Sequence, residues 1–283
     1  MLIKATNLTK KYGTKLALNH ATIKIDQGQL IAYLGTNGAG KSTTINLLTG
    51  LMNPTSGIIT RRQGIKIGIV FQDSILDKEL LVKDNLYFRS KLYHEDRSEW
   101  MYQLIQLMRL NNFLNQRYGT LSGGQRRRVD ITRALIIKPD ILFLDEPTTG
   151  LDLQTRLMIW NLLQRLQKEY GLTIFLTTHY LEEAENADQM YILENGKILI
   201  SGSVANIKER YAPTKLTVTT DGSELQTNHS QRCLSPRKFS FDGLTSLEVI
   251  TLLNHNQKHI TSFSYNPSSI NDAFVNITGK ELQ

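Results

Sequence analysis

Residues 121–125 have the sequence LSGGQ and lie between two other short motifs. Upstream, residues 35–43 have the sequence GTNGAGKST, which is rich in glycine and contains one lysine. Downstream, residues 141–147 have the sequence ILFLDEP, an apolar run followed by two carboxylates. The upstream motif predicts a phosphate-binding loop, and the downstream motif predicts a buried strand with acidic residues at its end. These three stretches together decide the fold class of the chain and its chemistry.

The composition indicates a globular chain with a basic balance. The 283 residues are enough for one large domain and a small one, and 40% of them are apolar, which is ample for a core. Lysine and arginine number 33 against 26 acidic residues, a net charge of +7. This balance suits nucleic acid or an anionic membrane surface as a partner, but a solvated basic surface explains it better. The single cysteine, Cys233, excludes an intrachain disulfide and suits a reducing compartment.

The sequence shows no pattern for membrane insertion or for secretion. No apolar run approaches the roughly 18 residues that a membrane-spanning helix needs. Residues 1–10 contain no apolar core of signal-peptide length. We therefore expect a cytosolic chain that serves a membrane, if at all, through another subunit.

Hydrophobic periodicity predicts a sheet with helices packed on it. Alternating apolar residues predict antiparallel strands over 2–8 and 16–25, and continuous apolar runs predict buried parallel strands over 30–34, 141–144 and 172–176. Helices are expected from residue 41 and over 79–93, 97–110, 123–137 and 153–169. The apolar face expected for the last helix comprises Leu153, Leu157, Trp160, Leu163 and Leu166. The pair Asn195-Gly196 predicts a hairpin turn. Strands alternating with helices give a mainly parallel sheet with right-handed crossovers.

A change of composition after Pro213 indicates a second, smaller domain. Residues 221–239 are polar and show no periodicity. Beyond them, helices are expected over 244–255 and 268–278, with a strand over 260–265. We predict a first domain over residues 1–212, with a helical subdomain at about 75–137, and a small α/β domain over 213–283.

The glycine-rich motif predicts a nucleotide-binding loop. Residues 35–42 match GxxxxGK[ST] in full and lie between a predicted strand and a predicted helix, the context that a P-loop requires. Glycine lets the backbone wrap a phosphate closely, and the helix N-terminus points its amides and positive dipole at the phosphates. We expect Lys41 to neutralise β- and γ-phosphate oxygens of ATP and the Ser42 hydroxyl to ligate Mg²⁺. The predicted cradle comprises Gly35, Asn37, Gly38, Ala39, Gly40, Lys41, Ser42 and Thr43.

The two carboxylates after the apolar run predict a catalytic pair. Asp145 ends a buried strand at the carboxyl edge of the sheet, where α/β proteins bind ligands. We expect it to hold Mg²⁺ opposite Ser42. Glu146 is the candidate general base for an attacking water, a role worth about 10²–10⁴-fold in rate. Without a P-loop in the same chain, a loop cap at Asp145 and a solvated Glu146 would be equally good explanations.

The LSGGQ motif has no role that the P-loop of its own chain requires. Ser122 and two glycines at a predicted helix start make a second anion-binding nest, and Ser122 also suits a plain helix cap. With LSGGQ between these flanking motifs, the chain resembles the ATPase subunit of an ABC transporter, densely over residues 2–210. The resemblance implies an α/β fold, a P-loop NTPase of the ABC ATPase type, with a mainly parallel core sheet, an antiparallel β subdomain and a helical subdomain.

The resemblance also implies a dimer. In ABC ATPases the LSGGQ nest closes over the γ-phosphate of ATP held by the other subunit, in a head-to-tail dimer with two ATP molecules. The resemblance thus assigns nucleotide contacts to Ser122, Gly123, Gly124 and Gln125. For Arg126, Arg127 and Arg128, which follow the motif, we expect a solvated or interface face rather than a nucleic-acid site.

Four further roles follow from the resemblance alone. Gln72 matches the glutamine that reaches Mg²⁺ and the attacking water, and His179 matches the switch histidine that contacts the γ-phosphate. Asp152 matches the aspartate that couples the two sites of the dimer. Tyr12 matches the aromatic residue that stacks on adenine, with a half-buried core tyrosine as the alternative. The expected catalytic set is Glu146, His179, Gln72 and Lys41, and the expected metal ligands are Ser42, Gln72 and Asp145.

The C-terminal sequence indicates which group of ABC ATPases the chain resembles. Residues 268–279, SSINDAFVNITG, resemble the S-L-x-D-x-F-x-x-x-T-G ending of bacterial drug and sodium exporter ATPases. The expected function is therefore the ATP-hydrolysing subunit of an exporter, bound to a membrane subunit at the cytoplasmic face, with a second ATPase copy and no direct nucleic-acid partner. An importer ATPase and a soluble ABC ATPase acting on nucleic acid or the ribosome are the alternatives. A module that binds ATP without hydrolysing it is opposed by the intact Glu146 and His179.

Overall fold

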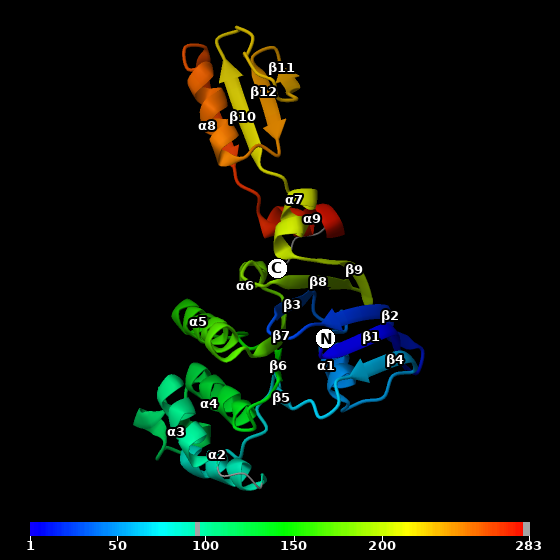
Figure 1. The fold of residues 1–283 in the computed structure, drawn as a ribbon, viewed down its shortest axis with the longest axis vertical. Helices are drawn as coiled ribbons and strands as arrows, with labels where there is room; N and C mark the ends of the chain where they lie inside the picture. The colour runs from blue at the N-terminus through cyan, green and yellow to red at the C-terminus, as the bar shows by residue number, and fades with distance from the viewer. Residues whose placement is uncertain (94–96, 280–283) are drawn as a thin grey trace. The chain divides into compact units, whose positions relative to one another are not determined.

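The computed structural model describes residues 1–93 and 97–279, and the chain folds into two compact units (Figure 1). The first is Met1–Ser201 and the second is Gly202–Gln283. Composition predicts a later boundary, at residue 212. The difference arises because helix α7 (Val204–Tyr211) packs against α9 (Ile270–Thr278) and so belongs to the second unit.

The first unit is built on a six-stranded sheet with the order β5-β6-β7-β3-β8-β9. Its parallel strands are β5 (Ile67–Val70), β6 (Ile141–Asp145), β7 (Thr173–Thr178), β3 (Leu30–Gly35) and β8 (Gln189–Glu194). Every residue of β3, β6 and β7 is buried, which explains the run of apolar residues in each of these strands. β9 (Lys197–Gly202) follows the predicted Asn195-Gly196 turn, where both residues have positive φ. The mainly parallel sheet is thus confirmed.

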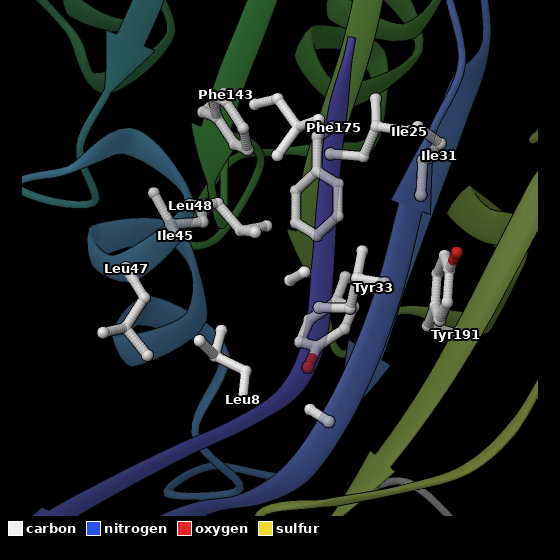
Figure 2. Close-up of a cluster of buried hydrophobic side chains, with 14 of the residues drawn as sticks. Leu8, Ile25, Ile31, Tyr33, Ile45, Leu47, Leu48, Phe143, Phe175 and Tyr191 are labelled. Atoms are coloured by element: carbon white, nitrogen blue, oxygen red, sulfur yellow. The ribbon is translucent and has the colours of Figure 1, made fainter. Parts of the chain in front are cut away.

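A three-stranded antiparallel sheet with the order β2-β1-β4 shares a core with the main sheet. Its strands are β1 (Ile3–Tyr12), β2 (Lys15–Ile25) and β4 (Ser56–Arg61). Helix α1 (Lys41–Thr49) packs into the same core through Ile45, Leu47 and Leu48 (Figure 2). In that core the Phe175 ring lies 5.3 Å from those of Tyr33 and Phe143. This packing fixes α1 against β3 and so sets the position of the P-loop between them.

Among the described residues, three helices between β5 and β6 form the predicted helical part. They are α2 (Val82–Lys91), α3 (Ser98–Leu107) and α4 (Gly123–Leu135), with short 3₁₀ turns at Asn111–Phe113 and Tyr118–Thr120. The helix predicted over 79–93 begins later than expected, because Leu81 pairs with Arg117 in a β-bridge.

Helix α5 (Leu153–Tyr170) confirms the helix predicted there, but its predicted apolar face is wrong in the first two turns. Trp160 and Leu163 are buried, whereas Leu153 is 66% exposed and Leu157 is 55% exposed. The apolar residues of the first two turns keep the same spacing as those of the later turns. Only the later turns bury apolar side chains against the rest of the chain. Helix α6 (Leu181–Ala184) is a single turn after β7.

The second unit contains a four-stranded antiparallel sheet with the order β11-β12-β10-β13. Its strands are β10 (Lys215–Thr220), β11 (Arg232–Ser235), β12 (Lys238–Asp242) and β13 (Ile260–Asn266), and its core includes residues of α8 (Ser246–His255). The non-periodic stretch 221–239 therefore contains β11 and the start of β12. All four residues of β11 are exposed, so the sequence carries no alternation that would mark it as a strand.

Candidate nucleotide-binding site

The P-loop joins the end of β3 to the start of α1. Gly35 is the last residue of β3, and Gly40 caps α1 with φ of 110°, in a region that favours glycine. A Cβ atom on Gly40 would lie 2.4 Å from the carbonyl oxygen of Ala17, so no larger residue fits there without displacing the backbone. The loop therefore delivers the free amides of the first turn of α1 to one place, as a phosphate cradle requires.

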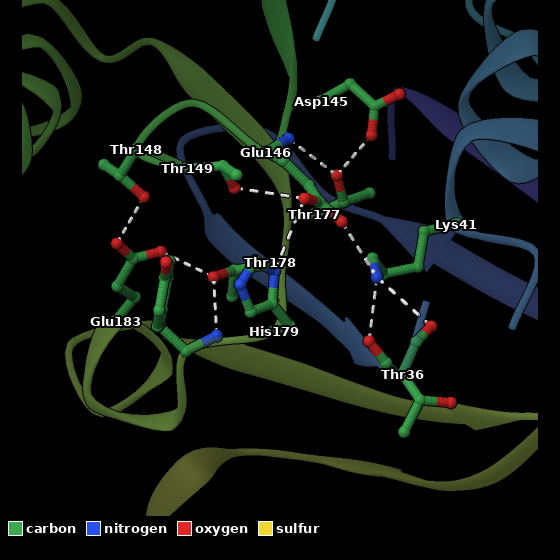
Figure 3. Close-up of polar contacts among 12 residues, drawn as sticks. Thr36, Lys41, Asp145, Glu146, Thr148, Thr149, Thr177, Thr178, His179 and Glu183 are labelled. Atoms are coloured by element: carbon green, nitrogen blue, oxygen red, sulfur yellow. Dashed lines mark hydrogen bonds and ion pairs between the residues drawn. The ribbon is translucent and has the colours of Figure 1, made fainter. Parts of the chain in front are cut away.

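Lys41 is held by oxygen atoms on the inner side of this loop. Its Nζ donates hydrogen bonds to the carbonyl oxygens of Gly35 (2.8 Å) and Thr36 (3.3 Å) (Figure 3). The same Nζ lies 3.0 Å from Oε1 of Glu146. Only 5% of Lys41 is exposed. The charge of this lysine is thus balanced by the carboxylate predicted to be the general base.

A single threonine on β7 contacts both acidic residues at the end of β6. The Thr177 hydroxyl donates to Oδ1 of Asp145 at 2.6 Å and accepts from the backbone N–H of Glu146 at 3.0 Å (Figure 3). Glu146 has φ of 46°, an uncommon conformation outside glycine that persists only where the surroundings hold it. Thr177 therefore orients the carboxylate of Asp145 and holds the backbone of Glu146 in place.

The Glu146 carboxylate is surrounded by donors. Thr149 Oγ1 donates to its Oε2 at 3.0 Å, and His179 Nδ1 lies 3.4 Å from the same oxygen. Burial raises the pKa of Glu146, but the Lys41 ammonium and the Thr149 hydroxyl outweigh burial and hold the pKa below its ordinary value. The carboxylate is ionised at neutral pH as a result, which a general base requires.

A cleft of about 660 Å³ opens beside the P-loop. Among the predicted site residues it is lined by Tyr12, Asn37, Gly38, Gly40, Lys41, Ser42, Thr43, Gln72, Glu146 and His179. Tyr12 is 44% exposed, so it is not a core tyrosine. Lys15, Ala17 and Thr149 also line the cleft, and no motif in the sequence marks them.

The remaining predicted residues lie outside the lining of this cleft. Gly35 and Ala39 are buried in the loop itself, and Asp145 is buried against Thr177. Ser122 and Gln125 form a reciprocal capping box at the start of α4, with Gly123 and Gly124 between them. Asp152 caps α5 by accepting from the backbone N–H of Thr155 at 2.9 Å. The LSGGQ motif and Asp152 therefore do not contribute to the cleft of their own chain.

Glu183 forms a buried polar network that no sequence motif indicates. Its carboxylate accepts hydrogen bonds from the hydroxyls of Thr148 and Thr178, the latter at 2.6 Å (Figure 3). Arg156 Nε of α5 lies 3.5 Å from the same carboxylate. The network ties the loop after Glu146 to the segment that carries His179.

The structure corrects the expectation for Arg127, which is buried rather than solvated. Its guanidinium donates to the carbonyl oxygens of Phe71 (2.7 Å), Gln72 (3.1 Å) and Glu146 (3.4 Å). Arg126 and Arg128, on either side, are partly exposed. Helix α4 thus reaches from the LSGGQ motif to the backbone of two predicted catalytic residues.

The donor atoms near the P-loop suit a magnesium ion that is also bound by phosphates. Among the described residues no group of three or more histidine, cysteine or acidic side chains is placed to hold a metal by itself. Mg²⁺ bound with a nucleotide takes one or two carboxylates, and substrate phosphates and water complete its shell. Asp145, Ser42 and Gln72 supply a carboxylate, a hydroxyl and an amide oxygen of the required kind. The protein residues therefore fit an ATP-bound Mg²⁺ and not a resident metal centre.

Comparisons with known proteins place this site in a family. A family model described as ABC transporter matches residues 18–149. The Nod factor export ATP-binding protein I of Burkholderia lata is 30% identical over 98% of this chain and 97% of its own length. The corresponding protein of Rhizobium johnstonii is 32% identical over 99% of this chain and 96% of its own length. A bacterial ABC transporter cassette solved as a dimer superposes with a TM-score of 0.66 and 29% identity, over 72% of this chain and 99% of that chain.

The fold and the cleft thus define a P-loop ATPase of the ABC type. The chain belongs to the ABC transporter family, and it is an ATP-binding and ATP-hydrolysing subunit. Among the described residues no helix is both long and apolar enough to cross a membrane.

Proposed function

We propose that this ATPase drives export through a separate membrane subunit, in an assembly with two ATPase copies. The supporting observation is the extent of the similarity. Two relatives named as export ATP-binding proteins match 98–99% of the chain, including the C-terminal unit, whereas the family model matches only residues 18–149. The ending at 268–279 contains the whole of helix α9.

In this proposal, ATP binding moves the Lys41 ammonium from Glu146 to the phosphates of ATP. The phosphates enter the P-loop cradle, and the Lys41 ammonium turns from Glu146 to the β- and γ-phosphate oxygens. Ser42, Asp145 and Gln72 would hold Mg²⁺, which neutralises phosphate charge when it is bound. Once Lys41 has left, Glu146 loses the cation that depresses its pKa, so its basicity rises as the substrate arrives.

Hydrolysis then depends on three groups at the γ-phosphate. Glu146 accepts the proton of the attacking water, and Gln72 orients that water. His179, already 3.4 Å from Glu146, donates to the γ-phosphate and holds it in line. Thr177 and the Glu183 network keep these groups at fixed separations, so catalysis rests on positioning and charge neutralisation.

The second copy completes each site. Ser122 lies at an exposed helix N-terminus outside its own cleft, with the amides of two glycines beside it. Such a terminus binds anions, and a head-to-tail dimer would bring it to the γ-phosphate of the other copy. Asp152, exposed at the start of α5, would lie at the same interface.

The membrane subunit is proposed to dock beside Gln72. Exposed apolar side chains gather in the sequence that follows it: Ile75, Tyr87, Phe88 and Leu92. Exposed large apolar residues of this density mark an interaction site on a protein that otherwise folds alone. The docking surface is therefore the loop at 72–80 together with α2.

Co-sedimentation tests this proposal. Co-expressed with the membrane subunit, the wild-type chain should sediment with membranes and resist a high-salt wash, because a packed apolar contact is not screened by salt. Phe88→Asp should release the protein, and Leu51→Asp, at an exposed apolar residue outside the docking surface, should not. Complete release of the wild type by salt, or tight DNA binding with a steep salt dependence, would contradict the proposal.

A further inference from the structure

Strand β13 is an open edge of the C-terminal sheet. Among the described residues its only neighbour is β10, so the N–H and C=O groups on its other side have no strand partner. A strand in this position is a template for a further strand. β13 spans seven residues, whereas β11 at the opposite edge spans four.

The side chains of β13 lack the features that usually protect an edge. From Ile260 to Asn266 the strand carries no charge and no proline. Phe263 is 58% exposed in its middle. The opposite edge carries Arg232, whose charge would repel its counterpart in a second copy. Of the two edge strands, β13 is therefore better suited than β11 to pair with the same strand of a second copy.

The register with β10 separates the side chains of β13 by face. Phe263 lies opposite Val218 and Tyr265 lies opposite Leu216, so both aromatic rings share the face of the sheet that faces the core. Ser264 lies opposite Thr217 on the other face. The register shifts near Thr220, which leaves 262–266 as the regular part of the strand.

We propose that β13 pairs antiparallel with β13 of a second copy of this chain, with Ser264 opposite Ser264 of the second copy. This register places Phe263 opposite Tyr265 of the second copy, and the two-fold symmetry forms that pair twice. Cross-strand aromatic pairs stabilise antiparallel strands, and the centre of the pairing holds two small hydroxyl side chains. The two four-stranded sheets become one continuous eight-stranded sheet.

The strand pairing rests on the proposed function, because the proposed two-copy assembly is what brings the two β13 strands close together. Five paired residues make a small contact that is weak between free molecules. An ATP-closed dimer links the two C-terminal units, so the strands meet at a high effective concentration. The strand pair then forms a second contact between subunits, in addition to the ATP sites.

Cysteine crosslinking tests the register in the full chain. The background carries Cys233→Ser, because the native thiol is exposed on β11, and Glu146→Gln, which should keep ATP between the copies. Ser264→Cys in this background should form an intermolecular disulfide with ATP and Mg²⁺ under mild oxidation. Ser262→Cys is the matched control, because residue 262 lies opposite 266 and about 13 Å from residue 262 of the second copy, beyond disulfide reach.

Adding Phe263→Asp should reduce the Ser264→Cys crosslink at least tenfold, while size-exclusion still shows the ATP-dependent dimer. An ATP-dependent dimer in which Ser264→Cys forms no disulfide would overturn the strand pairing alone. Equal crosslinking of Ser262→Cys would overturn the register. If size-exclusion shows no ATP-dependent dimer, the proposed two-copy assembly fails, and the pairing that depends on it fails with it.

Discussion

The Lys41–Glu146 ion pair makes a quantitative prediction for nucleotide affinity. Because Lys41 must leave Glu146 to reach a phosphate, the pair competes with the nucleotide. At 3.0 Å and an effective dielectric constant of ~20 the attraction is at most about 5.5 kcal/mol, and desolvation of both groups cancels most of it. About 1–2 kcal/mol of attraction between Lys41 and Glu146 then remains to oppose nucleotide binding, which equals a factor of roughly 5–30 in Kd. Glu146→Gln should therefore bind nucleotide more tightly by this factor while it loses turnover by about 10²–10⁴-fold.

The assay must separate this effect from dimer formation, which also tightens apparent binding. Calorimetric titrations are therefore compared in a Ser122→Arg background, where the second copy cannot complete the site. ADP is the informative ligand, because it engages Lys41 through its β-phosphate but lacks the γ-phosphate that a Glu146 carboxylate would repel. Equal ADP affinities with and without Glu146→Gln would refute the competition, and a gain confined to ATP would attribute the effect to charge repulsion instead.

The same ion pair predicts a pH dependence of the nucleotide-free protein. The pKa of Glu146 is held below its ordinary value of 4.5, so the pair stabilises the fold above about that pH. As the pH falls through the lowered pKa, the carboxylate is protonated and this contribution is lost. The difference in thermal stability between wild type and Glu146→Gln should be constant from pH 7 to pH 5 and shrink below. A difference that grows on acidification would show that the carboxylate is not paired.

Further substitutions separate binding from catalysis. Lys41→Ala should abolish measurable ATP binding in a titration, because phosphate charge is left uncompensated, whereas Tyr12→Ala should cost only about 1–3 kcal/mol of stacking. Ser122→Arg should leave ATP binding by the monomer intact and abolish ATPase activity, and equal loss of binding would contradict its role in the second copy's site. Glu183→Gln should lower kcat with little change in KM, since it keeps the shape of the network but removes its charge; an unchanged kcat would confine Glu183 to a structural role.

The fold and much of the cleft were predictable because their signals are local. The P-loop pattern specifies a strand, a tight glycine turn and a helix, and these are the elements that position Lys41 and Ser42. The continuous apolar run before Asp145 likewise predicts a buried strand and the edge at which it ends. Each of these inferences depends on residues within about ten positions of one another.

The parts that were not predictable depend on contacts between distant segments. Thr177 holds Asp145 and the backbone of Glu146 because β6 and β7 are paired in one register, and the three threonines of β7 give no sign of which one does so. Lys15 lines the cleft because β2 folds over the P-loop from the second sheet. The prediction of a solvated or interface face was wrong for Arg127. Three consecutive arginines do not indicate which of them donates to buried carbonyl oxygens.

Arg127 also explains how one helix can serve two sites. Helix α4 begins at Ser122, which in the proposed dimer contacts the ATP of the second copy. Five residues later the same helix sends Arg127 to the carbonyl oxygens of Gln72 and Glu146 in its own site. A helix of this length moves as a rigid body, so a displacement at its N-terminus must also displace these hydrogen bonds. Arrival of the second copy's ATP at Ser122 would therefore displace the backbone of Gln72 and Glu146 in the first site, and Gln72 also begins the proposed docking loop.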